Sequence, residues 1–262
     1  MCSSDLHGNQ TKLAGKIVQI IRQAKVSQDS HFHLGEPCAD CEIREIGVCN
    51  SMEPEELEEI RRIVSTLTLH PGQSAIVEGE PAQDLFNVIN GSVKLYKLLP
   101  DGRRQITGFL SSGDFLGIAY NDTYAYTAEA ITDVKLCRFP RRRLEALLPD
   151  HPTLERRLLG EAAHELVAAQ DQMLLLGRKT AMERVTSFLS MLAKRAARTR
   201  KSTENLEVPM TRTDIGDYLG LTTETVSRAI SRLRDDKIVS VATRGQIVIL
   251  DREALERLTE GE

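Results

Sequence analysis

The segment that decides the fold reads MTRTDIGDYLGLTTETVSRAISRLRDDKIV, from Met210 to Val239. Thr211 is suited to cap a short helix, and Gly220 is suited to end it, because glycine adopts a left-handed backbone at the least cost. Thr222 or Thr223 is placed to cap a second helix. The apolar residues expected on the inner face of that second helix are Val226, Ile230 and Leu233. Two short capped helices joined by a glycine turn predict a helix-turn-helix.

The second helix of such a motif lies in the major groove of DNA, with its first residues at the base edges. Arginine can bond guanine O6 and N7 together, and a carboxylate can accept from cytosine N4. Glu224, Ser227 and Arg228 share one face of the helix, so they are predicted to read bases. Contacts to the DNA backbone are expected from Thr211, Thr213, Thr222 and Arg232, with Arg234 adding charge. The alternative is an exposed helix face with an ordinary Glu–Arg pair.

The residues after the motif predict a small wing. VSVATRGQIVIL, Val239–Leu250, is typical of a hairpin that turns at Arg244–Gly245. Residues 179–262 are therefore expected to form three helices and a hairpin, a winged helix-turn-helix. They carry 15 basic and 13 acidic residues, whereas the first 178 carry 19 and 25. The net charge of −4 for the whole chain thus conceals a mildly basic DNA-binding part.

A long helix is expected before this domain, from about Thr153 to Lys179. Its apolar residues alternate at spacings of three and four, which is typical of a two-stranded coiled coil, although a helix packed on its own domain shows the same pattern. The predicted dimer seam is Leu159, Ala162, Leu166, Ala169, Met173 and Leu176.

Between Leu67 and Phe139, short β-type runs alternate with glycine-rich turns such as NGS and PDG. This alternation of short β-type runs and turns predicts an all-β sandwich, jelly roll or barrel. Just before it, Ser51 is suited to cap a helix that begins near Pro54.

Five cysteines are present, and three of them, Cys38, Cys41 and Cys49, fall within twelve residues. An odd number in a chain without secretion signals favours metal or cluster ligation over disulfides. Cys137, on a late strand, is the candidate fourth ligand, and Cys2 is expected to be a bystander. Four thiolates suit an iron–sulfur cluster or tetrahedral zinc, and a zinc site could take a nitrogen ligand from His31 or His33.

Composition excludes several other classes of protein. No run approaches 18 apolar residues, which argues against a membrane span, and no signal sequence is evident, so we expect a cytoplasmic protein. A helix over Lys12–Lys25 has no assigned role. Neither a nucleophile–base pair nor a radical-type cysteine motif occurs, so we expect no enzyme. A regulator in which Cys38 and Cys41 form a redox disulfide stays open.

The order of these parts resembles the CRP–FNR superfamily of bacterial transcription regulators over about residues 38–250. DGRRQITGFLSSGDFLG, Asp101–Gly117, resembles the β-roll of the FNR branch, and LTTETVSRAISRL, Leu221–Leu233, resembles its recognition helix. The resemblance implies an oxygen-responsive homodimer that binds a TTGAT–N4–ATCAA palindrome and acts with RNA polymerase, mainly as an activator. It also implies one [4Fe–4S] cluster per subunit, held by Cys38, Cys41, Cys49 and Cys137.

Cyclic-nucleotide binding, the other ligand class of this fold, is not expected. The cAMP-responsive branch holds the cyclic phosphate with an arginine, and Phe115–Ala130 contains none. We therefore predict an α+β chain of four parts: an N-terminal extension with the cysteine loop at 1–50, a β-roll at 51–148, a dimerisation helix at 149–178 and a winged helix-turn-helix at 179–262.

Overall fold

The computed structural model describes residues 38, 41–119, 122–198, 202–243 and 245–261, all within the unit Phe32–Glu262. Cys2, His31, His33 and the helix expected over Lys12–Lys25 lie outside these residues. Among the described helices, none combines the length and apolar character needed to cross a membrane.

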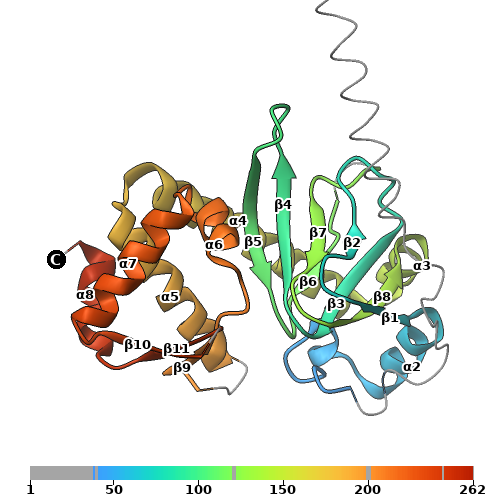
Figure 1. Ribbon diagram of the computed structural model, residues 1–262. Helices are drawn as coiled ribbons and strands as arrows, with labels where there is room; N and C mark the ends of the chain where they lie inside the picture. Colours follow the sequence, from blue (N-terminus) through green and yellow to red (C-terminus); the bar gives the residue numbers. More distant parts are fainter. Residues whose placement is uncertain (1–37, 39–40, 120–121, 199–201, 244, 262) are drawn as a thin grey trace, which may run out of the picture. The chain divides into compact units, whose positions relative to one another are not determined.

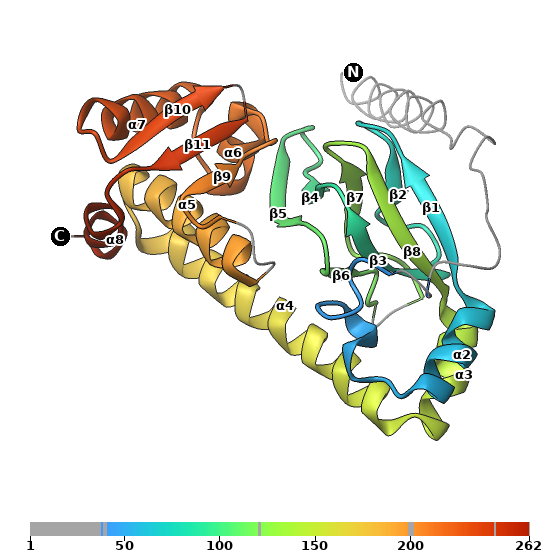
Figure 2. The ribbon, with the colours of Figure 1, turned by 90° about the horizontal axis from the view of Figure 1, so that it is seen from below.

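The β-rich segment forms two four-stranded antiparallel sheets (Figures 1 and 2). The first has the order β1-β8-β3-β6, and the second has the order β2-β7-β4-β5. One apolar core draws on both sheets, with Phe86 and Val88 from the first and Val93 and Leu95 from the second. The strands are β1 (Ser65–Leu69), β2 (Ser74–Ile76), β3 (Asp84–Asn90), β4 (Val93–Leu98), β5 (Arg104–Leu110), β6 (Phe115–Leu116), β7 (Thr127–Ala130) and β8 (Val134–Pro140).

The face of the first sheet that points away from this shared core is also covered. Residues Leu85 and Ile89 of β3 alternate with Phe86 and Val88, and they belong to a second apolar cluster together with Leu154. This second cluster also takes residues from the cysteine segment and from nearby helical elements. These elements are η1 (Val48–Ser51), α2 (Pro54–Ile63), α3 (Arg141–Leu147), η2 (Leu148–Asp150) and α4 (Pro152–Arg178). A central strand buried on both faces can therefore hold polar residues only where they have a function or a partner.

The prediction that Ser51 caps the following helix is wrong. Residues Val48–Ser51 form a short 3-10 helix, and α2 has Glu53 as its N-cap and Pro54 as its first residue. The Glu53 backbone N–H donates to Glu56 Oε2 at 2.8 Å, so a glutamate three residues further on satisfies the helix start.

His151 joins the first turn of α4 to α2. It is 6% exposed, and its Nε2 lies 2.8 Å from Glu59 Oε2 while its Nδ1 lies 3.2 Å from Glu56 Oε1. Both ring nitrogens face carboxylates, an arrangement that only the doubly protonated ring can satisfy. The hydrogen bond to Glu59 raises the pKa of His151 above its ordinary value of 6.5, against the opposing effect of burial.

This contact predicts a pH-dependent stability. A raised histidine pKa stabilises the fold fully below pH 6.5, and that contribution disappears as pH rises through the higher pKa of the folded state. Unfolding in urea at pH 6 and pH 8 is expected to show a larger difference between the wild type and His151→Gln at pH 6. The same substitution at the exposed His70 serves as the control. An equal effect of His151→Gln at both pH values would contradict the assignment.

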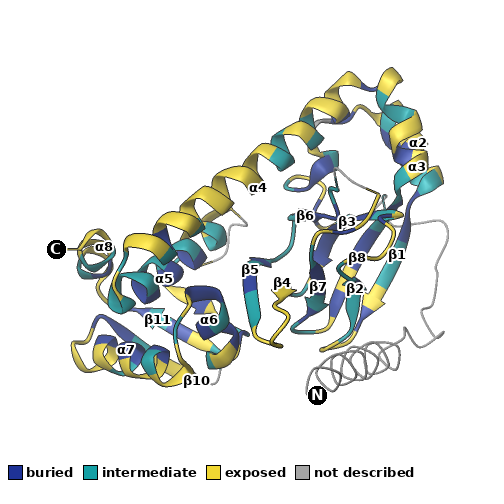
Figure 3. Cartoon of the chain, turned by 90° about the horizontal axis from the view of Figure 1, so that it is seen from above, coloured by how far each residue is buried: buried dark blue, intermediate teal, exposed yellow. Residues whose placement is uncertain are grey.

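Helix α4 runs for 27 residues and buries little of its surface within the chain, as its mainly yellow colour in Figure 3 shows. Leu154 and Leu175 are its buried residues. Three positions of the predicted seam are strongly exposed, Leu159 at 70%, Leu166 at 61% and Met173 at 71%. Of the other seam positions, Ala162 is half-buried, Ala169 is exposed, and Leu176 packs against the apolar core of the chain's own C-terminal domain.

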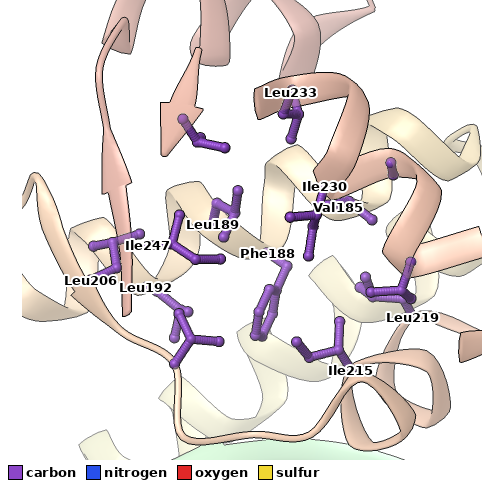
Figure 4. Packing of buried hydrophobic residues seen from close by; sticks show 14 of the residues in the cluster. Val185, Phe188, Leu189, Leu192, Leu206, Ile215, Leu219, Ile230, Leu233 and Ile247 are labelled. Carbon is purple, nitrogen blue, oxygen red and sulfur yellow. The ribbon is translucent and has the colours of Figure 1, made fainter. Parts of the chain in front are cut away.

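The C-terminal domain packs around Phe188, Leu189 and Val185 of its first helix (Figure 4). Its three-stranded sheet has the order β10-β11-β9. The described elements are α5 (Ala181–Arg198), β9 (Asn205–Glu207), α6 (Arg212–Leu219), α7 (Thr223–Asp235), β10 (Val239–Thr243), β11 (Gln246–Ile249) and α8 (Arg252–Glu260).

Two of these elements were not expected from the sequence. Besides the three predicted helices and the hairpin, the domain contains strand β9, which pairs with β11, and the terminal helix α8. The Asp251 side chain accepts from Ala254 N–H at 2.9 Å and caps α8, and Leu255 is buried against the domain core. The expectation of three helices therefore missed one, because α8 is short and offers one fully buried side chain.

Candidate DNA-reading surface and cysteine cavity

Helix α6 and helix α7 meet at the glycine turn that the sequence predicts. Thr211 Oγ1 accepts from Asp214 N–H at 3.0 Å, and Thr222 Oγ1 accepts from Thr225 N–H at 3.1 Å, so each helix has a threonine cap. Gly220 has φ +63° in the left-handed region. At Gly216 a Cβ atom would lie 2.6 Å from the Leu221 carbonyl oxygen, so only glycine lets the turn fold back onto α6.

The predicted base-reading residues lie together on the open face of α7. Glu224, Ser227 and Arg228 are all exposed, whereas Val226 and Ile230 face the domain core. An Arg228 guanidinium nitrogen donates to Glu224 Oε1, and Ser227 Oγ donates to the Thr223 carbonyl oxygen at 2.8 Å. The Glu224–Arg228 pair is exposed at both ends, so it is weak and can rearrange on a ligand.

The predicted backbone-contacting residues are also exposed on α6, α7 and their caps. Thr211, Thr213 and Thr222 are exposed at or near the starts of α6 and α7, where helix N-termini favour anions such as phosphate. Arg232 is exposed one turn beyond Arg228 and lies 3.8 Å from Asp236. The motif therefore presents a basic and hydroxyl-bearing rim around a face that can form hydrogen bonds with bases.

The second candidate site is an apolar cavity on the outer face of the first sheet. The cysteines of the described residues line this cavity. Cys38, Cys41, Cys49 and Cys137 all line it, and all four are free thiols. Cys137 comes from β8, and the other three come from the segment before α2, which shares one apolar cluster with β8 and the start of α4. This cavity holds about 20 Å³, room for about one water molecule. Among the described residues, no three His, Cys, Asp or Glu side chains are grouped as a ready site for a single metal ion.

The electrostatics of the cavity disfavour four thiolates without a cation. Burial raises the pKa of the Cys49 thiol to about 12, and the charges of Cys38 and Cys41 add to the increase. Burial also raises the pKa of Cys137 well above its ordinary value, and the other three cysteines act in the same direction. The four sulfurs are thus close enough to repel one another as thiolates, and a bound cation would relieve that repulsion.

The lining of the cavity fits a sulfur-ligated group. The donor set is four soft thiols, which suit iron–sulfur clusters and zinc. Asn87, on β3, also lines the cavity, and its buried Oδ1 has no hydrogen-bond partner among the described residues. A Cβ atom at Gly47 would lie 2.5 Å from Asn87 Nδ2, so glycine there keeps space beside the amide.

A further polar contact, not visible in the sequence, joins the β-roll to the helix-turn-helix. Lys94 of β4 bonds Asp214 of α6 at 3.1 Å and Glu129 of β7 at 2.9 Å. Arg104 of β5 bonds Asp214 and Asp217, each at 2.8 Å. Lys94 and Asp214 are 8% and 4% exposed, so this is a buried ion-pair network.

Apolar packing supports the same contact. Phe109 of β5 belongs to the core of the C-terminal domain, with ring centroids 5.1 Å from Tyr218 and 5.9 Å from Phe188. Gln105 Nε2 also donates to the Asp217 carbonyl oxygen at 2.7 Å. The β4–β5 hairpin therefore contacts α6, the first helix of the DNA-reading motif (Figures 1 and 2).

Comparison with known proteins agrees with this architecture. Residues 66–151 match the cyclic nucleotide-binding domain family, and residues 183–258 match the Crp-like helix-turn-helix domain family. The structure of FixK2 from Bradyrhizobium japonicum is similar, with a TM-score of 0.71 and 40% identity, covering 75% of this chain and 97% of that one.

Relatives at the sequence level are transcription regulators. The chain is 38% identical over 235 residues to the transcriptional activatory protein AadR of Rhodopseudomonas palustris, covering 86% of this chain and 98% of the relative. It is 37% identical over 218 residues to the transcriptional activator protein FnrL of Cereibacter sphaeroides, covering 82% and 88%. With these relatives and the helix-turn-helix in place, the chain belongs to the CRP–FNR family of DNA-binding transcriptional activators, and it is not an enzyme.

Proposed function

We propose that this chain is an oxygen-responsive activator that holds one [4Fe–4S] cluster per subunit and works in the cytoplasm. Under low oxygen it binds, as a homodimer, a palindrome like TTGAT–N4–ATCAA and acts with RNA polymerase on anaerobic or microaerobic genes. The observation that carries the proposal is that Cys38, Cys41, Cys49 and Cys137, separated by up to a hundred residues, line one cavity. Similarity to FnrL adds support.

The four thiols would be the cluster ligands, and the cluster would supply an oxygen-labile positive centre that keeps them as thiolates. Three of the four ligands, Cys38, Cys41 and Cys49, would come from the cysteine segment, which ends in η1. Element η1, which carries Cys49, contacts α4, and Val48 of η1 and Leu154 of α4 belong to one apolar cluster. Its position is therefore linked physically to the helix that we assign to dimerisation.

The homodimer rests on the exposed apolar stripe of α4. Leu159, Leu166 and Met173 lie at heptad spacing and are all more than half exposed, which indicates a missing partner surface. A second copy supplies such a surface, and a two-fold dimer matches a palindrome.

Leu166→Arg is expected to weaken the dimer at least about tenfold, because each seam would bury two unpaired charges. Sedimentation at micromolar concentration, without oxygen, measures the change. His164→Arg is the matched control, since His164 is exposed on the opposite side of the predicted heptad. Equal association of the two variants would contradict the seam.

A cyclic nucleotide is not part of the proposal. The chain matches the cyclic nucleotide-binding domain family in fold, but Phe115–Ala130 carries no cationic side chain for the phosphate. Lys94, on the neighbouring strand β4, is engaged with Asp214 and Glu129.

The test is DNA binding to the palindrome by anaerobically purified protein, before and after exposure to air, together with iron and sulfide analysis. We expect about four irons and four sulfides per subunit and binding that is lost in air. Cys137→Ala should abolish the iron and sulfide content and the anaerobic DNA binding, whereas Cys2→Ala should leave all of these unchanged. Zinc without sulfide would favour a structural zinc site, and a metal-free protein with an air-induced disulfide would favour thiol-redox sensing; either result rejects the cluster.

A further inference from the structure

Asn87 is a buried amide in an otherwise apolar position. It lies in the middle of β3, is 2% exposed, and pairs in register with Cys137 of β8. Its strand neighbours on the same face, Leu85 and Ile89, are apolar and pack into the second core cluster. An apolar side chain would pack equally well at position 87, so the presence of a buried amide there requires an explanation.

The described residues around Asn87 do not explain the amide, because they do not satisfy its oxygen. Within the described residues its Oδ1 has no hydrogen-bond partner, although the atom is buried. A buried polar atom without a partner lowers stability, so native proteins keep one mainly where a ligand, ion or water completes it. The side chain lines the cavity that the four cysteines share, and Gly47 leaves room beside it.

We propose that Asn87 is a positioning residue that tunes the sulfur-ligated group, an inference that rests on the proposed cluster. An amide has two N–H donors and one acceptor, and a half-turn about its last side-chain bond exchanges them. An oxygen cannot donate to sulfur, so the role requires the exchanged orientation, in which the NH₂ group takes the place of the unpartnered Oδ1; from there Asn87 would donate to a sulfur, either Cys137 Sγ or a sulfide. Hydrogen bonds to sulfur are among the features that set cluster potentials.

The expected direction follows from charge. A donor N–H stabilises the more negative, reduced form of the cluster, so it raises the reduction potential and makes loss of an electron to dioxygen harder. Asn87 would therefore slow the response to air and set the oxygen level at which the regulator switches off. Removing the donor should make the sensor respond faster and at lower oxygen.

The experiment compares anaerobically purified full-length wild type with Asn87→Leu, which keeps similar bulk without a donor, and Asn87→Ser, which keeps a smaller donor. Leu85→Val is the matched control, since Leu85 lies two residues away on β3, is buried in the same apolar cluster and is not among the residues that line the cavity. The measurements are iron and sulfide content, the reduction potential, the rate of visible bleaching in air-saturated buffer, and the shift of iron–sulfur stretching bands in D₂O.

We expect Asn87→Leu to have a lower potential, to bleach on the order of threefold faster, and to lose part of the D₂O shift. Leu85→Val should match the wild type, and Asn87→Ser should lie between the wild type and Asn87→Leu. A loaded Asn87→Leu protein with wild-type potential, bleaching rate and D₂O shift overturns the inference while leaving the cluster in place.

Failure to load is also decisive. If Asn87→Leu folds by circular dichroism but takes up no cluster, loading of Asn87→Ser supports the donor role. If neither folded variant loads, Asn87 acts in shaping the cavity, and the donor role is rejected. A wild-type protein without iron and sulfide rejects the proposed function itself, so the two failures are distinguishable.

Discussion

Asp214→Ala is expected to lower the free energy of unfolding by about 3–5 kcal/mol, the range for breaking a buried ion pair from one side. The Asp214 carboxylate accepts from Lys94 Nζ at 3.1 Å and from Arg104 at 2.8 Å. It also accepts from Thr211 Oγ1 at 2.6 Å and completes the cap of α6. Alanine leaves the buried Lys94 with Glu129 alone and removes the cap.

The loss of unfolding free energy caused by Asp214→Ala should be large at neutral pH and smaller in acid. Burial acts to raise the pKa of Asp214, but the hydrogen bond from Thr211 and the charge of Lys94 outweigh it, so the pKa lies below its ordinary value of 3.8. The stabilisation by the carboxylate is then complete above pH 3.8 and is lost as pH falls through the lower pKa of the folded state.

Urea unfolding of the reduced apo-protein at pH 7 and fixed concentration measures the change. Glu256→Ala is the control: it removes the exposed partner of Arg252 and should cost less than about 1 kcal/mol. Equal midpoints for the two variants would show that the network between Lys94, Arg104 and Asp214 contributes little to stability.

Arg228→Ala is expected to reduce selectivity for the guanine of each half-site by about 1–3 kcal/mol, or about 5- to 150-fold. Arg228 is 78% exposed in its side chain, and its weak, exposed ion pair with Glu224 can open when DNA binds. The guanidinium released from this pair can donate to O6 and N7 of guanine while Glu224 accepts from a neighbouring cytosine.

The measurement is the ratio of affinities for the palindrome and for a variant with the guanine pair replaced by adenine–thymine, at one salt concentration. Arg232→Ala should weaken binding to both DNAs alike and reduce the salt dependence, as expected for a phosphate contact. A ratio for Arg228→Ala unchanged from the wild type would remove Arg228 from base readout.

The helix-turn-helix could be predicted because its signals are local. Thr211, Gly220 and Thr222 determine caps and a turn within a dozen residues, and the structure places all three in those roles. The long helix and the β-rich region follow from periodicity in the same way. The cysteine ligand set could be proposed because cysteine is rare and chemically distinctive, so Cys137 stood out despite its distance from Cys49.

Contacts between distant residues could not be predicted this way. Lys94 and Asp214 are 120 residues apart, and neither lies in a pattern that sets it apart from other charged residues. Asn87 looked like an ordinary strand residue in LFNVI, because no periodic signal shows that both faces of β3 are buried. Ser51 was a plausible cap, but the cysteine segment packs as a 3-10 helix and moves the start of α2 to Pro54.

The shared packing of Phe109 limits how the reading domain can be exchanged between regulators. A domain cut out at residue 179 would leave Tyr218 and Phe188 without the ring that covers them, and would expose part of its core to water. A hybrid regulator would need β5 of the donor protein as well as its winged helix. The unit that can be transplanted is therefore larger than the DNA-binding domain, and it includes a strand of the sensor.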